Sequence, residues 1–414
     1  MPSITREDLA ARDAADPLKS FRGRFDIPEG LIYLDGNSLG PLLNSVRDRV
    51  ADVVSREWGQ DLITSWNKNK WMELAGRIGG KIAPMIGAGG HEVLAADSTS
   101  INIFKLLSAA LKMRPGRRVI LSEAGNFPTD LYIAEGLVSL LGGDYSLRLM
   151  DKAENLADYL DDDVAVVMIT QVDYRTGRKL DMAAVTKQVQ DAGALMLWDL
   201  AHSAGAFPVD LNGAKADFAV GCGYKYLNGG PGAPAFLFVA DRHQATIQPA
   251  LSGWLGHANP FAFTSDYKPA TGIARHTVGT PPVLSMSALD EALSLFAEVP
   301  MEGLLKKSQQ LTGLFIDLVE QECGGHGLEL ASPREAAARG SQVSFRSQNG
   351  YAIMQALIAR KVIGDFRDPD IMRFGFAPLY ISYADVWDAV AILRDVLETG
   401  AWDVDAFKQR AAVT

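Results

Sequence analysis

The stretch LMLWDLAH at residues 195–202 predicts the fold of this chain, because a short apolar run ends there in an acid. Comparable apolar runs stand at residues 118–122, 165–170, 218–222 and 236–239. Nearly continuous apolar runs are typical of strands that are buried on both faces of a sheet. Segments with helical periodicity lie between them, at 102–112, 130–141 and 182–191. This alternation predicts an α/β layer fold whose ligand lies beyond the carboxyl ends of the strands.

The two ends of the chain depart from this alternation. After about residue 285, a long helical pattern from 287 to about 323 precedes short strand candidates at 342–346 and 373–376 and helices around 351–360 and 384–398. Before it, the first 45 residues contain only a strand and turn at 32–40. We therefore expect an N-terminal segment at 1–45 that packs with a small α+β domain at 286–414, and a large α/β domain at 46–285.

The composition limits the class of protein. Of 414 residues, 48% are hydrophobic and 22% are charged, which is typical of soluble globular proteins, and two cysteines exclude a disulfide scaffold. A net charge of −10 disfavours general binding to nucleic acid or to an anionic membrane. The N-terminus lacks a secretory apolar run, and the six histidines show no metal-binding spacing. We expect a cytoplasmic enzyme with no metal, membrane or nucleic-acid partner.

Two charged residues stand at the ends of predicted strands. Asp199 ends the run at 195–199, where an acid points into the ligand cleft of an α/β fold or serves as an N-cap. Lys225 lies in GCGYKYLNGGPG at 221–232, and a lysine there either reaches back to solvent or forms Schiff bases with carbonyls. Pyridoxal phosphate requires this pair, because a lysine captures its aldehyde and a carboxylate keeps its ring nitrogen protonated.

Two further stretches match parts of such a cofactor. DSTSIN at 97–102 leads into an apolar helix and supplies hydroxyls and backbone amides for a phosphate, although a plain N-cap is the alternative. Phe127, in NFPTD at 126–130, offers a flat face for the cofactor ring, and a buried core aromatic is its alternative. Together with Asp199 and Lys225, these stretches predict a pyridoxal-phosphate site.

The chain resembles the kynureninases, which are pyridoxal-phosphate enzymes of the aspartate aminotransferase superfamily. The matching stretches span nearly the whole chain in order: LDGNSLG (34–40), FPTD (127–130), WDLAHSAG (198–205), YKYLNGG (224–230), SGW (252–254) and IMRFGF (371–376). The resemblance implies fold type I of these enzymes, in which helices sandwich a mainly parallel, seven-stranded mixed sheet and a small α+β C-terminal domain follows. It also implies a homodimer with its active sites at the subunit interface.

The resemblance further implies a role for each matching residue. Lys225 binds the cofactor aldehyde, Asp199 pairs with the ring nitrogen and Phe127 stacks on the ring. The other implied cofactor contacts are Thr99, Ser100, Asp130, Thr170, His202 and Tyr224, with Trp254 and Thr280 coming from the neighbouring subunit. For the substrate, Arg373 is expected to bind the α-carboxylate with Ser38 beside it, and an ion pair between domains is the alternative for Arg373.

The implied reaction is hydrolysis of L-kynurenine to anthranilate and L-alanine by Cβ–Cγ cleavage, a step of tryptophan catabolism. Trp66 and Thr280 resemble the bacterial-type enzymes, which favour kynurenine over 3-hydroxykynurenine. A tryptophan can stack on the substrate ring, and a core or dimer-interface aromatic is the alternative. Tyr224 is expected to move a proton to the β-carbon, for which the cofactor phosphate or a cation would have to lower its pKa.

Two other classes of protein are considered. A cysteine desulfurase would share the acid, the histidine and the lysine but needs a thiol on a flexible loop. Cys323 ends a helical pattern and Cys222 lies in a predicted strand, so neither fits. A non-enzymatic relative with the same fold would lack at least one of Lys225, Asp199 and Arg373, and all three are present.

Overall fold

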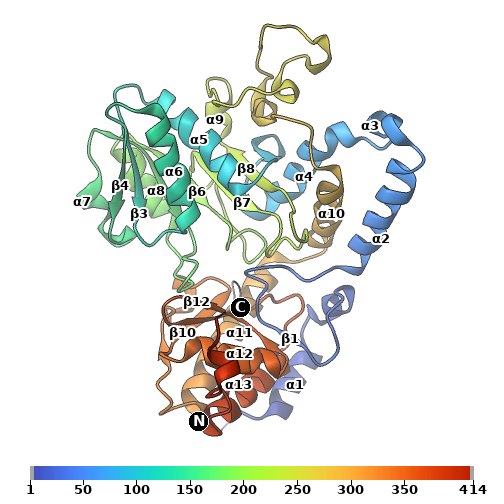
Figure 1. Cartoon of the computed structure of the whole chain (residues 1–414), viewed down its shortest axis with the longest axis vertical. Helices are drawn as coiled ribbons and strands as arrows, with labels where there is room; N and C mark the ends of the chain where they lie inside the picture. Colours follow the sequence, from blue (N-terminus) through green and yellow to red (C-terminus); the bar gives the residue numbers. More distant parts are fainter. Residues whose placement is uncertain (1–3, 411–414) are drawn as a thin grey trace.

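A seven-stranded mixed sheet forms the centre of the larger of two bodies in this computed structural model, which describes residues 4–410 (Figure 1). Its strands lie in the order β2-β8-β7-β6-β5-β3-β4. Their bounds are β2 (Val93–Ala95), β3 (Val119–Glu123), β4 (Ser146–Met150), β5 (Val164–Thr170), β6 (Leu195–Asp199), β7 (Phe218–Cys222) and β8 (Ala235–Val239). The pairs from β7 to β4 are parallel, whereas β8 is antiparallel to both of its neighbours. The predicted mainly parallel seven-stranded sheet is therefore confirmed.

Helices cover both faces of this sheet. One face packs against α5 (Thr99–Met113) and α6 (Pro128–Leu141). The other packs against α4 (Leu74–Ile82), α8 (Met182–Asp191) and α10 (Val283–Ser294). Every residue of β5, β6, β7 and β8 is buried, as expected for strands between two helical layers, and this burial explains their continuous apolar sequences.

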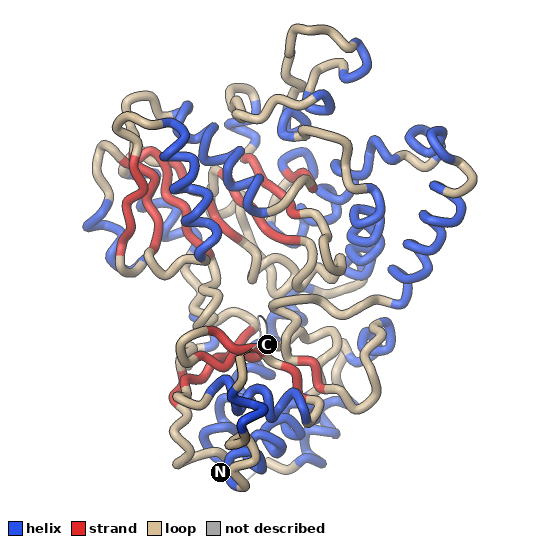
Figure 2. The backbone as a smooth tube through the Cα atoms, in the orientation of Figure 1, coloured by secondary structure: helices blue, strands red, loops and turns tan. Residues whose placement is uncertain are grey.

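The smaller body contains an antiparallel sheet with helices packed on it (Figure 2). Its strands are β9 (Glu329–Leu330), β10 (Gln342–Arg346), β12 (Asp365–Arg367) and β13 (Ile371–Gly375), in the order β12-β13-β10-β9. Its main helices are α11 (Met301–Glu322), α12 (Gly350–Ala359) and α13 (Tyr383–Glu398). The ring of Phe315 lies 4.9 Å from that of Phe374 and 5.1 Å from that of Phe376, between helix and sheet. The small α+β domain expected after residue 285 matches this body.

The long helix predicted from 287 to about 323 is wrong, because the structure contains two helices there. Helix α10 ends at Ser294, a 3-10 turn spans Leu295–Ala297, and α11 begins at Met301. Pro300 directly precedes α11 and cannot donate a backbone hydrogen bond, and proline also disfavours helical backbone at the residue before it. The apolar periodicity on both sides of Pro300 made the two helices resemble one.

The first 45 residues contact the small body. Helix α1 (Arg6–Ala14) lies against α13, and β1 (Ile32–Tyr33) pairs in parallel with β11 (Val362–Ile363). A buried ion pair joins Asp16 to Lys307 of α11 at 2.7 Å. These contacts support the expected packing of this segment, while the domain boundaries at 45 and 285 stay predictions. The remaining helices are α2 (Asn44–Asp52), α3 (Ser65–Lys68), α7 (Leu156–Tyr159), α9 (Asp241–Gln244) and α14 (Asp405–Lys408).

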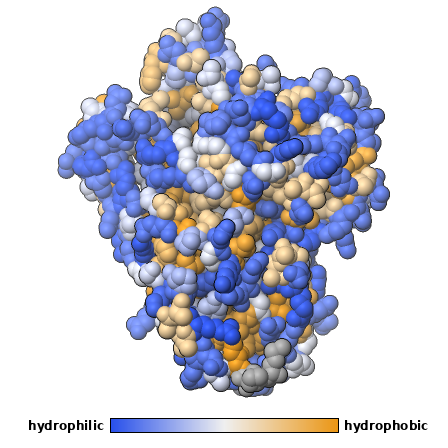
Figure 3. All heavy atoms as spheres, turned by 180° about the vertical axis from the view of Figure 1, so that it is seen from behind, coloured by the Kyte–Doolittle hydropathy of each residue, from blue (hydrophilic) through white to orange (hydrophobic). Residues whose placement is uncertain are grey.

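Polar residues dominate the surface. Figure 3 shows hydrophilic residues over most of the face opposite to that of Figure 1, with apolar atoms gathered in smaller patches between them. Within residues 4–410, no helix is long and apolar enough to cross a membrane. The same residues contain no group of three or more His, Cys, Asp and Glu side chains that could hold a metal ion.

Candidate active site

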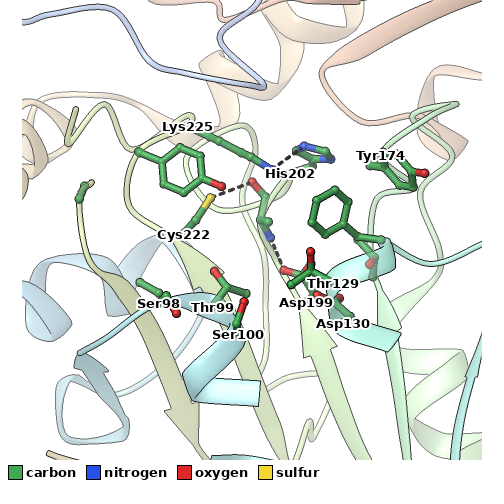
Figure 4. A pocket seen from close by; sticks show the side chains of 16 residues that line it. Ser98, Thr99, Ser100, Thr129, Asp130, Tyr174, Asp199, His202, Cys222 and Lys225 are labelled. Carbon is green, nitrogen blue, oxygen red and sulfur yellow. Dashed lines mark hydrogen bonds between the residues drawn. The ribbon is translucent and has the colours of Figure 1, made fainter. Parts of the chain in front are cut away.

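A pocket of about 260 Å³ lies where β5, β6 and β7 end and α5 begins (Figure 4). Because these strands are parallel neighbours, their carboxyl ends bring residues from distant parts of the sequence to one edge of the sheet. The lining includes the predicted cofactor residues Thr99, Ser100, Phe127, Asp130, Thr170, Asp199, His202, Tyr224 and Lys225. It also includes Ser98, Thr129, Tyr174, Ala201, Cys222, Ala233 and Ala235. The residues that the sequence selected as cofactor contacts therefore lie together in one pocket, and their individual roles stay predictions.

Asp199 is a buried carboxylate without a direct counterion. Its Oδ1 accepts a hydrogen bond from the backbone amide of Ala201 at 2.8 Å, and among the described residues it forms no ion pair. Burial raises its pKa, and the charge of Lys225 opposes that rise. Asp130 lies beside it, and burial followed by the charge of Asp199 raises the pKa of Asp130 well above its usual value. A protonated ring nitrogen would supply the cation that this corner lacks.

Lys225 is held by a neutral histidine. Its Nζ lies 2.9 Å from Nε2 of His202, and Figure 4 shows the two groups pointing toward each other at the mouth of the pocket. Burial lowers the pKa of His202 well below its usual value, and the positive charges of Lys225, Arg373 and Arg367 lower it further. Nε2 of the neutral ring therefore accepts from the lysine, and Nδ1 carries the proton. This contact directs the lysine amine at the pocket, not at solvent.

The start of α5 has the donors that a phosphate needs. Ser98 is the N-cap, and its Oγ accepts from the amide of Ile101 at 3.4 Å. Thr99 and Ser100 form the first turn, which contains no acidic residue, and both line the pocket. Backbone amides at a helix N-terminus, together with the helix dipole, favour a bound anion. This helix start therefore fits a phosphate group. Ser98 also forms the ordinary N-cap that was the alternative for this stretch.

Phe127 is not the core aromatic considered as its alternative, because 42% of its surface is exposed at the pocket. Its ring meets the ring of Tyr174 edge to face at 5.3 Å and 84°. Thr170, at the end of β5, donates a hydrogen bond to Oδ1 of Asn126, next to Phe127. Tyr174 was not singled out in the sequence, although its position just after β5 places it among the loops where a ligand is expected.

Tyr224 retains its proton in this environment. Burial raises the pKa of its phenol, and the nearby Cys222 and Asp199 raise it further. The sequence required a lowered pKa for Tyr224 to act as a base, and the described residues act in the opposite direction. A phenol of this kind is a proton donor at neutral pH.

Arg373 lies outside the pocket lining and is almost fully buried. It stands opposite Asp365 in the β12–β13 register, and the two side chains form a forked ion pair whose Nε–Oδ1 distance is 2.8 Å. Its Nη2 also donates to Oγ of Ser38 at 2.8 Å, and its Nη1 to the carbonyl of Tyr174 at 2.6 Å. The ion pair considered as an alternative for Arg373 is therefore present, but its partner lies within the small body. The Tyr174 contact also brings this guanidinium to the edge of the pocket.

Besides Arg373 and Ser38, three further predicted residues do not line this pocket. Trp66, on α3, packs edge to face on Trp71 with ring centroids 5.7 Å apart. Trp254 is 38% exposed and contacts Phe261 at 5.8 Å. Thr280 lines a separate cavity of about 660 Å³. A single chain therefore does not bring these side chains to the Lys225 pocket.

The fold and the pocket define this chain as a fold type I pyridoxal-phosphate enzyme. An apo cysteine desulfurase from Thermococcus onnurineus superimposes with a TM-score of 0.78 at 17% identity, over 96% of this chain and 100% of that one. A C-DES mutant with glycine covalently linked to its PLP cofactor superimposes with a TM-score of 0.78 at 18% identity, over 90% and 99% of the two chains. At such low identity these structures share the fold alone.

The chain belongs to the kynureninase family. It is 55% identical to the kynureninase of Burkholderia mallei over 99% of this chain and 100% of that relative. It is 51% identical to the kynureninase of Pseudomonas fluorescens over the same shares. The profile of the kynureninase C-terminal domain matches residues 304–393. Both cysteines are buried, which agrees with the rejection of a desulfurase that uses a loop thiol.

Proposed function

We propose that this chain hydrolyses L-kynurenine to anthranilate and L-alanine with pyridoxal phosphate as its cofactor. One observation supports this most directly: a kynureninase-family chain places an uncompensated buried carboxylate, Asp199, and a histidine-held amine, Lys225, in the same pocket. When bound there, pyridoxal phosphate supplies an electron sink for the bonds around the substrate Cα.

Each side of the pocket has a role in holding this cofactor. Thr99 and Ser100 bind the phosphate with the first amides of α5, and Phe127 covers one face of the ring. Asp199 would accept a hydrogen bond from the ring nitrogen, and burial together with the charge of Asp199 raises the pKa of Asp130, which favours the neutral form of that second carboxyl. Thr170 and His202 complete the lining.

Lys225 and Tyr224 move the protons. With the cofactor bound, Lys225 Nζ would be the base that takes the proton from the substrate Cα, and neutral His202 would hold the Lys225 amine in place through Nε2. Water then attacks Cγ and the Cβ–Cγ bond breaks. The Tyr224 hydroxyl, whose pKa is raised by burial, donates its proton to Cβ of the alanine fragment.

Arg373 binds the substrate α-carboxylate. Its guanidinium uses Nε and Nη2 for Asp365 and one N–H of Nη1 for the carbonyl of Tyr174, which leaves the second N–H of Nη1, at the edge of the pocket, for the substrate carboxylate. Ser38 supports Nη2 from the N-terminal segment. The substrate is thus held between the two bodies of the chain.

The working unit is a homodimer with shared active sites. Trp254 and Thr280 lie away from the pocket of their own chain, and the segment that carries Trp254 exposes Phe261 and Phe263, which are 60% and 79% accessible. A second copy that covers these rings would receive Trp254 and Thr280 at its own phosphate site. Trp66 and Thr280 then favour kynurenine over 3-hydroxykynurenine. The cytoplasmic location expected from the sequence stays a prediction.

An absorbance spectrum tests this function directly. The purified protein should show a visible-violet band that changes when L-kynurenine is added, while anthranilate fluorescence appears. The Lys225→Ala variant should lose the part of the band that arises from the bond between lysine and cofactor, and it should lose turnover. A band without anthranilate would contradict the substrate, and no band after addition of pyridoxal phosphate would contradict the cofactor site.

A further inference from the structure

Lys105, in the second turn of α5, is a fully buried lysine that the mechanism above does not use. Its Nζ forms an ion pair with Asp97 and donates to the backbone carbonyl of His276 at 2.6 Å. A buried ammonium is costly unless it is paired, so these two contacts fix the position of both partners. Asp97 lies directly before Ser98, the N-cap of α5, and we assign the start of this helix to the cofactor phosphate.

Asp97 determines how the chain enters α5. Its φ of +47° lies in the left-handed region, which is uncommon for a residue other than glycine. Its carbonyl accepts from the amide of Ala235 at 2.9 Å, and the preceding carbonyl of Ala96 accepts from Nδ2 of Asn102 at 2.8 Å. Together with the ion pair between Lys105 and the Asp97 side chain, three contacts hold this turn in place. This turn sets the direction of the amides of Thr99 and Ser100.

His276 connects the same lysine to a different segment. It ends the 3-10 helix Gly272–His276, and the chain continues to Val278 and Thr280. The carbonyl of Val278 accepts from the amide of Leu255 at 3.3 Å, and a Cβ at Gly253 would collide with that carbonyl. The segments that carry Trp254 and Thr280 are therefore in close contact. Lys105 joins this pair of segments to the turn at Asp97.

We propose that Lys105 is a positioning residue for the cofactor phosphate. It acts by locking the Asp97 turn, and with it the first turn of α5, against the segment that carries Thr280. This proposal depends on the proposed function in one respect: the cofactor phosphate must bind at the start of α5.

Lys105 acts through geometry and not as a phosphate ligand. It does not line the pocket, and its charge is already matched by Asp97. Burial lowers the pKa of Lys105, and the contact with Asp97 opposes that change. Removing the ammonium should release the left-handed turn and misalign the phosphate donors, while Lys225 and Asp199 stay in place.

The test compares pyridoxal phosphate with pyridoxal, which has the same aldehyde and ring but no phosphate. Dissociation constants of both are measured on the full-length apoprotein for the wild type and Lys105→Met, a substitution that keeps an unbranched apolar side chain and removes the ammonium donors. We expect the dissociation constant of pyridoxal phosphate to rise about ten- to hundredfold, since hydrogen bonds to a charged group have effects of that size. That of pyridoxal should change little, so the preference for the phosphate form should fall.

Lys307 provides a matched control. It is also a buried lysine that pairs with an aspartate, Asp16 at 2.7 Å, and with a backbone carbonyl, that of Pro378 at 2.6 Å, but it lies in the small body. Lys307→Met should lower stability and leave the preference for pyridoxal phosphate unchanged. An equal change of both dissociation constants in Lys105→Met, or none, would overturn the proposal.

A second variant covers the case in which Lys105→Met does not fold. Asp97→Asn keeps the shape of the side chain and removes the charge that attracts Lys105, so it should shift the preference in the same direction by a smaller factor. An unchanged preference in this variant would also overturn the proposal. The wild type separates this result from the proposed function: if it binds no pyridoxal phosphate, the cofactor assignment is wrong, whereas normal wild-type binding leaves only the role of Lys105 in question.

Discussion

At the scale of single residues, the guanidinium of Arg373 makes two kinds of contact that a lysine cannot make together. One edge pairs with Asp365, while Nη1 and Nη2 reach Tyr174 and Ser38. In Arg373→Lys, a single ammonium would follow the buried Asp365 and leave the substrate carboxylate without its donor. We expect the KM for L-kynurenine to rise about ten- to hundredfold, with a smaller fall in kcat, in steady-state assays of anthranilate release.

Arg346→Lys is the control for this change. Arg346 lies on β10 of the same sheet and pairs with Asp370 at 3.0 Å, but it is partly exposed and has no contact with the pocket lining. Its substitution should leave KM unchanged. An unaltered KM in Arg373→Lys would show that the substrate carboxylate binds elsewhere.

The buried ring of His276 should make the free energy of unfolding decrease as the solution becomes more acidic. It is inaccessible, neither ring nitrogen has a partner within residues 4–410, and burial lowers its pKa to about 3. The folded state therefore keeps His276 neutral, whereas the unfolded chain binds a proton below its ordinary pKa of 6.5. Stability is consequently lost as the pH falls from 6.5 to about 3, by about 1.4 kcal/mol per pH unit for this residue.

The variant His276→Leu should be at least as stable as the wild type at pH 7, because it removes two unpaired buried polar atoms. At pH 5 its advantage should grow by about 2 kcal/mol, measured by urea unfolding at fixed protein concentration. The exposed His326 gives the control His326→Leu, which should show no such pH-dependent gain. An equal pH dependence in wild type and His276→Leu would contradict the neutral buried state.

The predicted residues that meet in the pocket share one property. Asp199, Lys225 and Thr170 lie at or just after the carboxyl ends of apolar runs, and the parallel sheet alone brings such positions together. Asp365 and Lys105 could not be found in this way. Asp365 reaches Arg373 through the register of two short antiparallel strands, and Lys105 is a polar residue within an otherwise apolar helix, so both contacts exist only after the chain has packed.

At the scale of elements, the loop after β5 fastens the large body to the small one. Nε2 of Gln342, on β10, donates to the carbonyls of Asp173 at 3.3 Å and Tyr174 at 3.1 Å, and the amide of Gly340 donates to Gly177 at 2.8 Å. The same carbonyl of Tyr174 accepts from Arg373. The position of this loop therefore determines how the substrate arginine faces the pocket.

Gly177→Ala tests this connection. Gly177 has a φ of +72°, and a Cβ there would lie 2.8 Å from Cγ of Gln342 and 2.9 Å from its carbonyl oxygen. The added methyl should push Gln342 away from Tyr174, which should raise the KM for L-kynurenine about tenfold and lower stability by about 1–3 kcal/mol. Steady-state kinetics and thermal unfolding measure the two effects.

Gly116→Ala separates backbone strain from the contact with Gln342. Gly116 has a φ of +94°, and no atom lies within 4 Å of the place of its Cβ. It should lose stability through its backbone conformation and keep its KM. If Gly177→Ala also keeps its KM, the loop does not control Arg373.

The sheet strands missed in the sequence are either very short or partly exposed. Strand β2 has only three residues, and β4 lies at the edge of the sheet, where Ser146 and Leu149 are exposed. An edge strand buries one side only, so its sequence lacks the signal that identified β5 and β6. The central strands and the helices between them were predictable because both faces of the sheet are covered.

At the scale of the whole molecule, several large apolar residues are exposed on segments that do not line the pocket. The largest exposed ones include Trp58, Leu62, Ile63, Phe261 and Phe263. The last two belong to the segment that projects from the top of the large body in Figure 1. Rings exposed to this degree are unfavourable in water, and their position next to Trp254 agrees with a projection that reaches into a second copy of the chain.

If the active sites are shared between two chains, as we propose, two inactive variants should restore each other. Lys225→Ala lacks the amine of its own pocket, and Trp254→Ala lacks the ring that we assign to the partner's pocket. In a hybrid dimer, the pocket with an intact Lys225 receives Trp254 from the other chain. Co-expression in equal amounts should therefore recover about a quarter of the wild-type anthranilate production, because half of the dimers are hybrids with one complete site each. If Trp254 served its own chain, every site would lack one of the two groups, and mixing would restore no activity.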